Sequence, residues 1–271
     1  MTAAKGRHGA RRLEGMQTIR TDVPHPARVY DYWLGGKDNF AIDREAAEEA
    51  LALVPEFADY AVENRKYLVR AVRFACDAGI RQFLDIGTGL PTSPNVHEIA
   101  QSADPGTRVV YVDNDPVVFL HAEALMARDA NTSVVRADLR DPGYVLGEAG
   151  RLLDFSQPVA LLFVACLHHL LDSDDPAGVV ARYLTVMAHG SLLILSHQTD
   201  EFAPDKMRQA SVEAEKAGLT FVPRSRADIL RLFNGRDLVE PGLVLVSRWR
   251  PDSPPGLNAV RAWAYGGVAR L

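Results

Sequence analysis

The sequence predicts an α/β fold in which a parallel sheet carries helices on both sides and is closed by an antiparallel hairpin. Five short apolar runs lack polar alternation, which is typical of strands buried on both faces. Segments with helical periodicity or helix-start signals separate these runs, as in a parallel sheet with crossover helices. Two final apolar runs, 243–249 and 262–268, are separated by about a dozen proline-rich residues, too few for a helical crossover.

The expected elements follow one another regularly from residue 82 onward. Ser93-Pro94, Asp115-Pro116 and Asp175-Pro176 each place a capping oxygen before a proline, which predicts three helix starts. A polar helix and a shorter one then precede the hairpin. The predicted strands are 82–86, 108–112, 133–137, 159–164 and 191–195, and the two later helices are 205–217 and 226–233.

Length and composition predict one large domain with a cap. The chain has 271 residues, of which 47% are hydrophobic, enough for a sizeable core. We expect a disordered tail over residues 1–20, a helical cap or lid over 21–80, and a ligand-binding domain over 81–271. Within the cap, helices are expected over 43–53 and 60–78, and Pro26 opens a short helix that the Gly35-Gly36 pair ends.

Charge and cysteine content argue against several classes of function. The net charge of −5 gives no general attraction for nucleic acid or an anionic membrane. No apolar run has the length of a membrane span, and no signal peptide is recognised. The two cysteines, Cys76 and Cys166, are far apart, so neither a disulfide framework nor metal-ligand spacing is present. We therefore expect a cytoplasmic protein without a metal.

The stretch 82–91 is the strongest single signal. A buried strand ends in Gly87-Thr88-Gly89, and a helix starts shortly afterwards. A strand, a glycine turn and a helix form the front half of a nucleotide-binding βαβ unit. Glycine is expected at such a turn because a side chain would keep the ligand away from the backbone.

Acidic residues follow the next two strands at the edge where ligands of open parallel sheets bind. Asp113, followed by Asn114, comes directly after the second strand, where a carboxylate accepts hydrogen bonds from two ribose hydroxyls. Asp138 follows the third strand and is expected to accept from an adenine amine, while Leu139 packs on the ring. Each signal is weak alone, but their order on successive strands makes the combination fairly specific.

The glycine turn distinguishes two ligands. The dinucleotide fingerprint needs a third glycine that lets the helix approach a pyrophosphate. That glycine is absent, and Pro91 and Pro94 stiffen the loop instead. S-Adenosylmethionine has no pyrophosphate, so the missing glycine favours it.

These motifs resemble those of class I S-adenosylmethionine-dependent methyltransferases. The run 85–89, Asp113 and Asp138 match the first three motifs of that class, and the terminal hairpin matches its Rossmann-like methyltransferase fold. The runs 25–32, 35–40, 89–92 and 239–244 are similar to an actinobacterial family of S-adenosyl methyltransferases that was formerly a domain of unknown function. The resemblance covers nearly the whole chain after about residue 20, but it supplies no substrate.

The resemblance implies how the cofactor is held. The Gly87–Gly89 backbone faces its methionine part, and Asp85 reaches its ammonium directly or through water. Pro91 departs from the glycine that many members carry, which shifts how the methionine end is held. The cofactor-binding residues implied in this way are Asp85, Gly87, Thr88, Gly89, Asp113, Asn114, Asp138 and Leu139.

The cap segment 23–40 combines aromatic and polar residues around a Gly-Gly pair. Either it is an N-terminal strap packed on the body, or it is a lid over a ligand. Asn64 and Arg65 are either ordinary surface groups or part of the same pocket. The lid or substrate candidates are His25, Arg28, Asp31, Tyr32, Gly35, Asn39, Asn64 and Arg65.

Catalytic candidates follow the fourth strand, at the edge that faces the reacting methyl group in methyltransferases. His168 or His169 is a candidate general base near neutral pH, and Tyr32 is a further candidate. The alternative for each histidine is a packed, hydrogen-bonded residue. Cys166 is interpreted as a small buried apolar group, and His197 is a weaker candidate.

Three functions remain open on the sequence alone. The leading one is a methyltransferase that uses S-adenosyl-L-methionine and acts on a small-molecule acceptor. The second is a non-catalytic regulatory protein that binds S-adenosylmethionine or S-adenosylhomocysteine. The third is an NAD-dependent oxidoreductase, for which no catalytic Tyr/Lys or His/Asp spacing is visible. The sequence names neither the acceptor atom nor the oligomeric state.

Overall fold

The computed structural model describes residues 19–125, 130–254, 256 and 261–271. Apart from its last two positions, the predicted tail of residues 1–20 lies outside these ranges. Within them, no helix is both long enough and apolar enough to cross a membrane.

Within the described residues, seven strands form one sheet in the order β3-β2-β1-β4-β5-β7-β6. β1 to β5 pair in parallel, and β7 pairs antiparallel with both β5 and β6. This confirms the predicted α/β fold and its closing antiparallel hairpin. The strands are β1 (Gln82–Ile86), β2 (Arg108–Asp113), β3 (Thr132–Arg136), β4 (Ala160–Val164), β5 (Leu192–Gln198), β6 (Val244–Leu245) and β7 (Ala264–Arg270).

The hairpin differs from the prediction in its first strand, which spans only Val244–Leu245. A 3-10 helix follows directly, and it turns Val246 and Trp249 toward α3 (Glu56–Asp77). The Arg70 guanidinium of α3 donates to the carbonyl oxygens of Val246 at 2.6 Å and Trp249 at 2.8 Å. These bonds satisfy carbonyls that a longer strand would have paired within the sheet.

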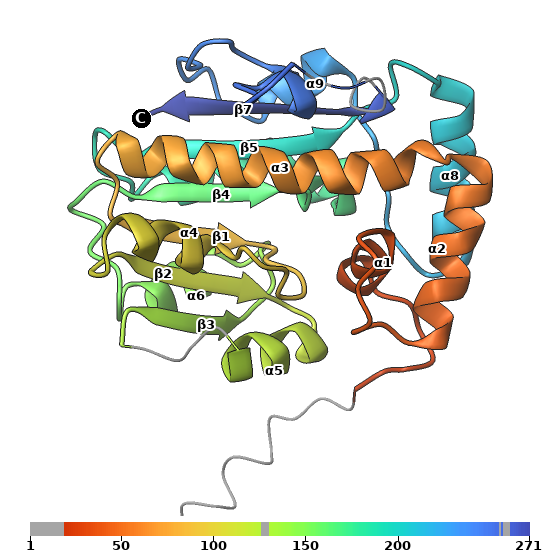
Figure 1. The fold of residues 1–271 in the computed structure, drawn as a ribbon, viewed down its shortest axis with the longest axis horizontal. Coiled ribbons are helices and arrows are strands. Elements are labelled where there is room, and N and C mark those ends of the chain that lie inside the picture. The colour runs from red at the N-terminus through yellow and green to blue at the C-terminus, as the bar shows by residue number, and fades with distance from the viewer. Residues whose placement is uncertain (1–18, 126–129, 255, 257–260) are drawn as a thin grey trace, which may run out of the picture.

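Helices cover both faces of the sheet, with α3 running across one face in front of β4 and β5 (Figure 1). Successive strand residues supply two separate cores: Phe83 packs with α3 and α4, and Leu84 packs with α6, α7 and α9. The helices are α1 (Pro26–Trp33), α2 (Ala41–Leu53), α3 (Glu56–Asp77), α4 (Val96–Ala103), α5 (Pro116–Leu125), α6 (Pro142–Ala149), α7 (Pro176–Leu184), α8 (Pro204–Lys216) and α9 (Arg226–Arg231).

Two of the three predicted helix starts have the expected cap. Asp175 and Asp115 each accept an N–H from the first turn of the helix that they precede. The prediction for Ser93-Pro94 is wrong, because α4 begins after Asn95 instead. The Glu98 carboxylate of its first turn accepts from the Asn95 N–H at 2.6 Å, which moves the helix start past the proline.

The cap stands beyond the carboxyl ends of the parallel strands, where α1, α2 and α8 lie together (Figure 1). A small core of Val54, Phe57, Met207 and Ala210, with Trp33 of α1 and Leu51 of α2 packed against it, joins these helices to the start of α3. The predicted boundary between cap and ligand-binding domain at residue 80 remains a prediction. α3, which lies on the cap side of that boundary, packs against the sheet. The cap therefore covers the edge at which the strand-end motifs converge.

Candidate cofactor and acceptor site

A cavity of about 550 Å³ lies between the strand ends and the cap. The ends of β1 to β4 supply one side of it, and α1, α2, α3 and α8 supply the other. All the residues predicted to bind the cofactor line this cavity. They are Asp85, Gly87, Thr88, Gly89, Asp113, Asn114, Asp138 and Leu139.

Both glycines of the turn adopt a left-handed backbone conformation, with φ of +71° at Gly87 and +70° at Gly89. A Cβ atom on Gly87 would lie 2.5 Å from Cβ of Cys166, whereas one on Gly89 would meet nothing within 4 Å. At Gly87 the structure therefore adds a reason beyond ligand access, because β4 brings Cys166 against the turn.

Asp113 is held in place by backbone donors. Its Oδ2 accepts from the Gly89 N–H at 2.9 Å, and its Oδ1 accepts from the Asp115 N–H at 3.0 Å. Burial raises the pKa of this carboxyl, while the nearby His25 and the two backbone donors oppose that shift. Each carboxylate oxygen keeps a lone pair, so Asp113 can still accept from ribose hydroxyls.

Asp85 is a second buried carboxyl beside the same turn. Burial raises its pKa to about 7, the neighbouring Asp113 adds to the shift, and the Arg65 guanidinium opposes it. A buried carboxyl with a raised pKa is stabilised in its ionised form by a bound cation. Its position therefore suits a ligand that carries an ammonium group.

Asp138 differs from the other two carboxylates because it is half-exposed and already paired. Its Oδ2 lies 2.6 Å from Nη2 of Arg140, and this hydrogen bond lowers the pKa of Asp138. An adenine amine would share this carboxylate with Arg140. The assignment of Asp138 and Leu139 to the adenine stays a prediction.

The loop that follows the glycine turn is fixed by Arg65, whose Nη2 donates to the carbonyl oxygens of Thr92 at 2.5 Å and Pro94 at 2.9 Å. Asn64, one residue earlier on α3, donates to the Tyr30 hydroxyl at 3.0 Å and accepts from Ser196 at 2.6 Å. Both Asn64 and Arg65 line the cavity, so they belong to the pocket rather than to an ordinary surface.

A buried ion-pair network joins the cap to the loop after β2. Nη1 of Arg28 lies 3.1 Å from Asp43, and its Nε lies 3.2 Å from Asp115. Nδ1 of His25 lies 3.1 Å from the same Asp115 oxygen. Since the Asp115 N–H donates to Asp113, the network connects the cap with the carboxylate expected to bind ribose.

Of the predicted lid residues in 23–40, only His25 lines the cavity. Asp31 instead accepts from the Asn39 amide at 2.7 Å and the Asp38 N–H at 3.1 Å, which closes the turn after α1. Arg28 is buried in the network, and Gly35 ends α1 with φ of +77°. These four residues therefore shape the cap and do not line the cavity: Arg28, Asp31, Gly35 and Asn39.

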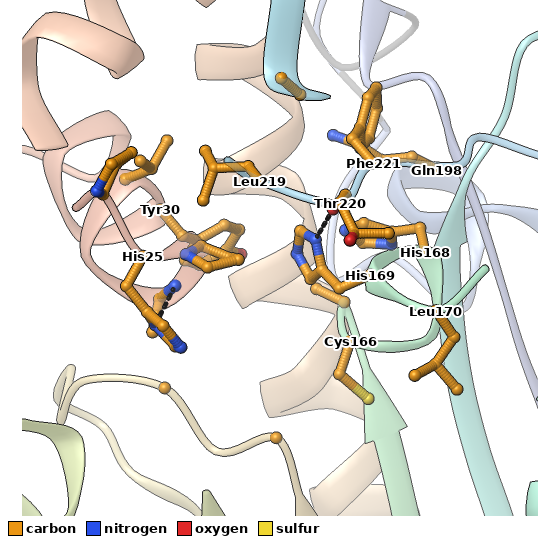
Figure 2. Close-up of a pocket in the computed structure, with 18 of the residues that line it drawn as sticks. His25, Tyr30, Cys166, His168, His169, Leu170, Gln198, Leu219, Thr220 and Phe221 are labelled. Atoms are coloured by element: carbon orange, nitrogen blue, oxygen red, sulfur yellow. Dashed lines mark hydrogen bonds between the residues drawn. The ribbon is translucent and has the colours of Figure 1, made fainter. Parts of the chain in front are cut away.

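Tyr32 also lies outside the cavity, so its prediction as a catalytic residue is withdrawn. Its hydroxyl donates to Glu48 of α2 at 2.8 Å, on an exposed part of the cap. The helical turn separates Tyr32 from Tyr30, and it is Tyr30 whose ring faces the cavity (Figure 2).

The two adjacent histidines lie in the 3-10 helix Leu167–His169, directly after β4. Figure 2 shows both rings beside the segment that carries Thr220, with Tyr30 of the cap opposite. Nδ1 of His169 lies 2.8 Å from the Thr220 carbonyl oxygen, which can only accept. Nδ1 therefore carries a proton, and in the neutral ring Nε2 keeps its lone pair.

Burial keeps all three histidines of this region neutral near pH 7. It lowers the pKa of His169 to about 4 and that of His197 to about 3, and the pKa of His168 also falls well below its usual value. His197 does not line the cavity; it is fully buried, and its Nε2 accepts from Arg224 at 2.9 Å. Only His168 and His169 of these three reach the cavity.

Sequence reasoning did not identify the aromatic wall of the cavity, two rings of which, Tyr60 and Phe221, meet His168 edge to face. Trp33, Phe57, Tyr60 and Phe221 all line the cavity, and they come from segments far apart in the chain. Helical periodicity marks such residues only as apolar, so no local signal separates them from ordinary core. The described residues contain no group of three or more His, Cys, Asp or Glu side chains that could hold a metal ion.

Comparisons with known proteins identify the family and agree with the fold. A family model described as S-adenosyl methyltransferase matches residues 13–271. A crystal structure of a Thermobifida fusca protein, described there as a candidate methyltransferase, is 43% identical, with a TM-score of 0.86 over 92% of this chain and 96% of that one.

A second crystal structure, of a DUF574 family protein from Streptomyces avermitilis, is also 43% identical. It aligns with a TM-score of 0.89 over 93% of this chain and 99% of that one. Among curated proteins, no sequence matches the chain significantly. With a family model matching nearly its whole length, the chain belongs to the S-adenosyl methyltransferase family, whose cofactor is S-adenosylmethionine.

Proposed function

We propose that this protein transfers a methyl group from S-adenosylmethionine to a small-molecule acceptor inside the cavity beneath the cap. One observation carries the proposal: a single cavity joins the strand-end residues assigned to the cofactor with the aromatic and histidine side chains under the cap. A volume of about 550 Å³ is within the range of small-molecule sites. The two substrates would meet at the end of β4.

The residues present fit the cofactor. The ammonium and sulfonium groups give S-adenosylmethionine a net positive charge, and the buried carboxyls Asp85 and Asp113 face the same cavity. Backbone donors orient Asp113, while Arg65 holds the loop beside the glycine turn. The bound cofactor supplies an electrophilic methyl group, so the chain's own task is to orient the acceptor and exclude water.

The oxidoreductase alternative is not supported. A dinucleotide would bring a doubly charged pyrophosphate to the glycine turn, where Asp85 is buried and carries no cation of its own within hydrogen-bond distance among the described residues. A pyrophosphate beside this buried carboxyl would oppose its ionisation, because like charges repel strongly where the dielectric constant is low. The family match favours the methyltransferase in addition.

The proposal is tested by titrating the protein with S-adenosylhomocysteine and measuring heat. We expect a dissociation constant in the micromolar range or below, which Asp113→Ala weakens by about tenfold or more because ribose contacts and the Gly89 anchor are both lost. Asp237→Ala serves as the matched control, since Asp237 is exposed and does not line the cavity.

Absence of binding by the unmodified protein would overturn the proposal. A regulatory protein without catalysis predicts tight binding that is never followed by methyl transfer. Incubation with methyl-labelled cofactor and a small-molecule extract separates the two, because only an enzyme moves label into an acceptor.

A further inference from the structure

The end of the cavity beneath the cap is walled by aromatic rings. Trp33 of α1 stacks on Phe57 of α3, with centroids 5.0 Å apart and an interplanar angle of 23°. Phe57 meets Phe221 edge to face at 5.7 Å, and Tyr30 meets Tyr60 in the same way at 6.0 Å. Aromatic walls of this kind favour a flat apolar ligand, because ring faces and edges both find complementary partners.

Buried charge is confined to the other end. Among the described residues that line the cavity, the only buried carboxyls are Asp85 and Asp113, and no lysine or arginine there is buried. Glu49 of α2 and Glu213 of α8 also line the cavity, but both are exposed. A charged acceptor would lose its hydration at the aromatic end without gaining a buried counter-charge. The acceptor end is thus suited to an uncharged molecule.

One hydrogen-bond acceptor at this end has a fixed orientation. The proton on Nδ1 of His169 is held by the Thr220 carbonyl oxygen at 2.8 Å. The Val222 N–H donates to the His168 carbonyl oxygen at 2.8 Å, so two bonds tie this segment to the histidine pair. Figure 2 shows the His169 ring between Thr220 and the side that faces Tyr30. The lone pair of Nε2 is therefore available to a ligand hydroxyl.

Two further polar atoms are unsatisfied. The Tyr60 hydroxyl and Nδ1 of His168 are buried without a hydrogen-bond partner in the described part of the chain. Both residues line the cavity, Tyr60 is 1% and His168 is 3% exposed, and their ring centroids lie 6.3 Å apart. Buried polar atoms in native proteins are nearly always paired, so a ligand group or an ordered water belongs beside them.

Building on the proposed methyltransferase function, we propose that the acceptor is an uncharged hydroxylated aromatic compound. Its ring lies against Trp33, Phe57 and Phe221 of the aromatic wall, and its hydroxyl donates to Nε2 of His169. In the transfer, the hydroxyl oxygen bonds to the methyl carbon, the carbon–sulfur bond breaks with its electron pair kept by sulfur, and the hydroxyl proton passes to Nε2. His169 is thereby the specificity-determining and proton-accepting residue.

The test measures binding of two probes in the presence of saturating S-adenosylhomocysteine. 1-Naphthol can donate a hydrogen bond, and 1-methoxynaphthalene has the same ring system but cannot. We expect the unmodified protein to bind 1-naphthol about tenfold more tightly. His169→Asn should abolish that preference. The asparagine amide can still donate to Thr220, but the shorter side chain has no atom at the position of Nε2.

His189→Asn is the matched control, since His189 is exposed and does not line the cavity. It should keep the full preference for 1-naphthol. The affinity of each variant for S-adenosylhomocysteine shows whether it is folded and whether the cofactor assignment holds. Equal binding of the two probes by the unmodified protein, no binding of either, or a preference that survives in His169→Asn would overturn the inference while leaving the methyltransferase assignment intact.

Discussion

The two ends of the cavity are built in different ways. The end proposed to bind the cofactor consists of strand termini, left-handed glycines and backbone N–H groups, and it includes the buried carboxyls Asp85 and Asp113. The end beneath the cap, where we propose that the acceptor binds, consists of aromatic and histidine side chains from α1, α3, the 3-10 helix after β4 and the segment after α8. One end is set by the sheet, and the other by how the cap packs on it.

This difference separates two kinds of specificity. Backbone donors at strand ends keep their positions when surface side chains change, because the sheet fixes them. The acceptor end depends on side chains from helices and loops, which can vary while the fold is retained. A family with this architecture can keep one cofactor and change its acceptor.

The largest effect is expected from breaking the network that connects the two ends. Arg28→Met removes the arginine cation that pairs with Asp43 and Asp115. The loss is costly because the side chains of all three residues are at most 4% exposed. Loss of one partner from a buried ion pair typically costs about 3–5 kcal/mol of unfolding free energy. Urea denaturation measures this loss, and S-adenosylhomocysteine binding should weaken as well.

Arg208→Met is the control for removing a cation from the cap. Arg208 pairs with Asp205, but the two side chains are 72% and 92% exposed, so the free energy of unfolding should hardly change. If both variants unfold at the same urea concentration, Arg28 does not hold the cap to the body.

A smaller effect is expected at the cofactor end from titration of Asp85. Burial raises its folded pKa to about 7, so the carboxyl is mostly protonated at pH 6 and mostly ionised at pH 8. The ammonium of S-adenosylhomocysteine favours the ionised form, and affinity should rise about tenfold between these values. Without ligand, Asp85 has the opposite effect on folding. Its folded form binds more protons than its unfolded form, so the free energy of unfolding falls as pH rises from the unfolded pKa of about 4 to about 7.

Calorimetric titrations at both pH values check this prediction. Asp85→Asn should bind more weakly and lose the pH dependence, whereas the exposed Asp237→Asn should keep it. If Asp85→Asn keeps the pH dependence, that dependence arises from another group, and Asp85 does not contact the ammonium.

The smallest effect is expected from Tyr32→Phe, which removes one exposed hydroxyl from the cap. The change eliminates the bond to Glu48 and leaves the ring in place. Since Tyr32 does not line the cavity, the affinities for S-adenosylhomocysteine and for 1-naphthol should both stay within about twofold of the original values. A tenfold loss of 1-naphthol binding would return Tyr32 to the acceptor site.

Most of the sheet was predictable because strands buried on both faces leave a clear sequence signal. β1 has the predicted bounds. The short connection between the last two strands predicted the β6–β7 hairpin, which the structure confirms. β5 extends to Gln198, because pairing with β7 satisfies the backbone of its polar end. Such long-range pairing leaves no local signal, and neither does the short β6, which depends on Arg70 of α3.

The candidate site was likewise predictable where the sheet places its residues, and not where tertiary packing does. Strand order alone brings Asp85, Asp113 and Asp138 to one edge, so their convergence on the cavity was predictable. Arg28 was a candidate for contact with a ligand, but its partner Asp115 lies far along the chain, and only the tertiary fold shows that the two meet. The aromatic wall was hidden for the same reason.

The salt bridges of Arg28 make Asp115 an anchor that belongs to the body while its partners Arg28 and His25 lie in the cap. A chimera that receives the cap of a distant relative would have to supply a matching cation. Otherwise it would bury an unpaired carboxylate next to Asp113. To transfer the proposed acceptor preference between relatives, the cap would therefore have to be exchanged together with the residue at position 115, and not alone.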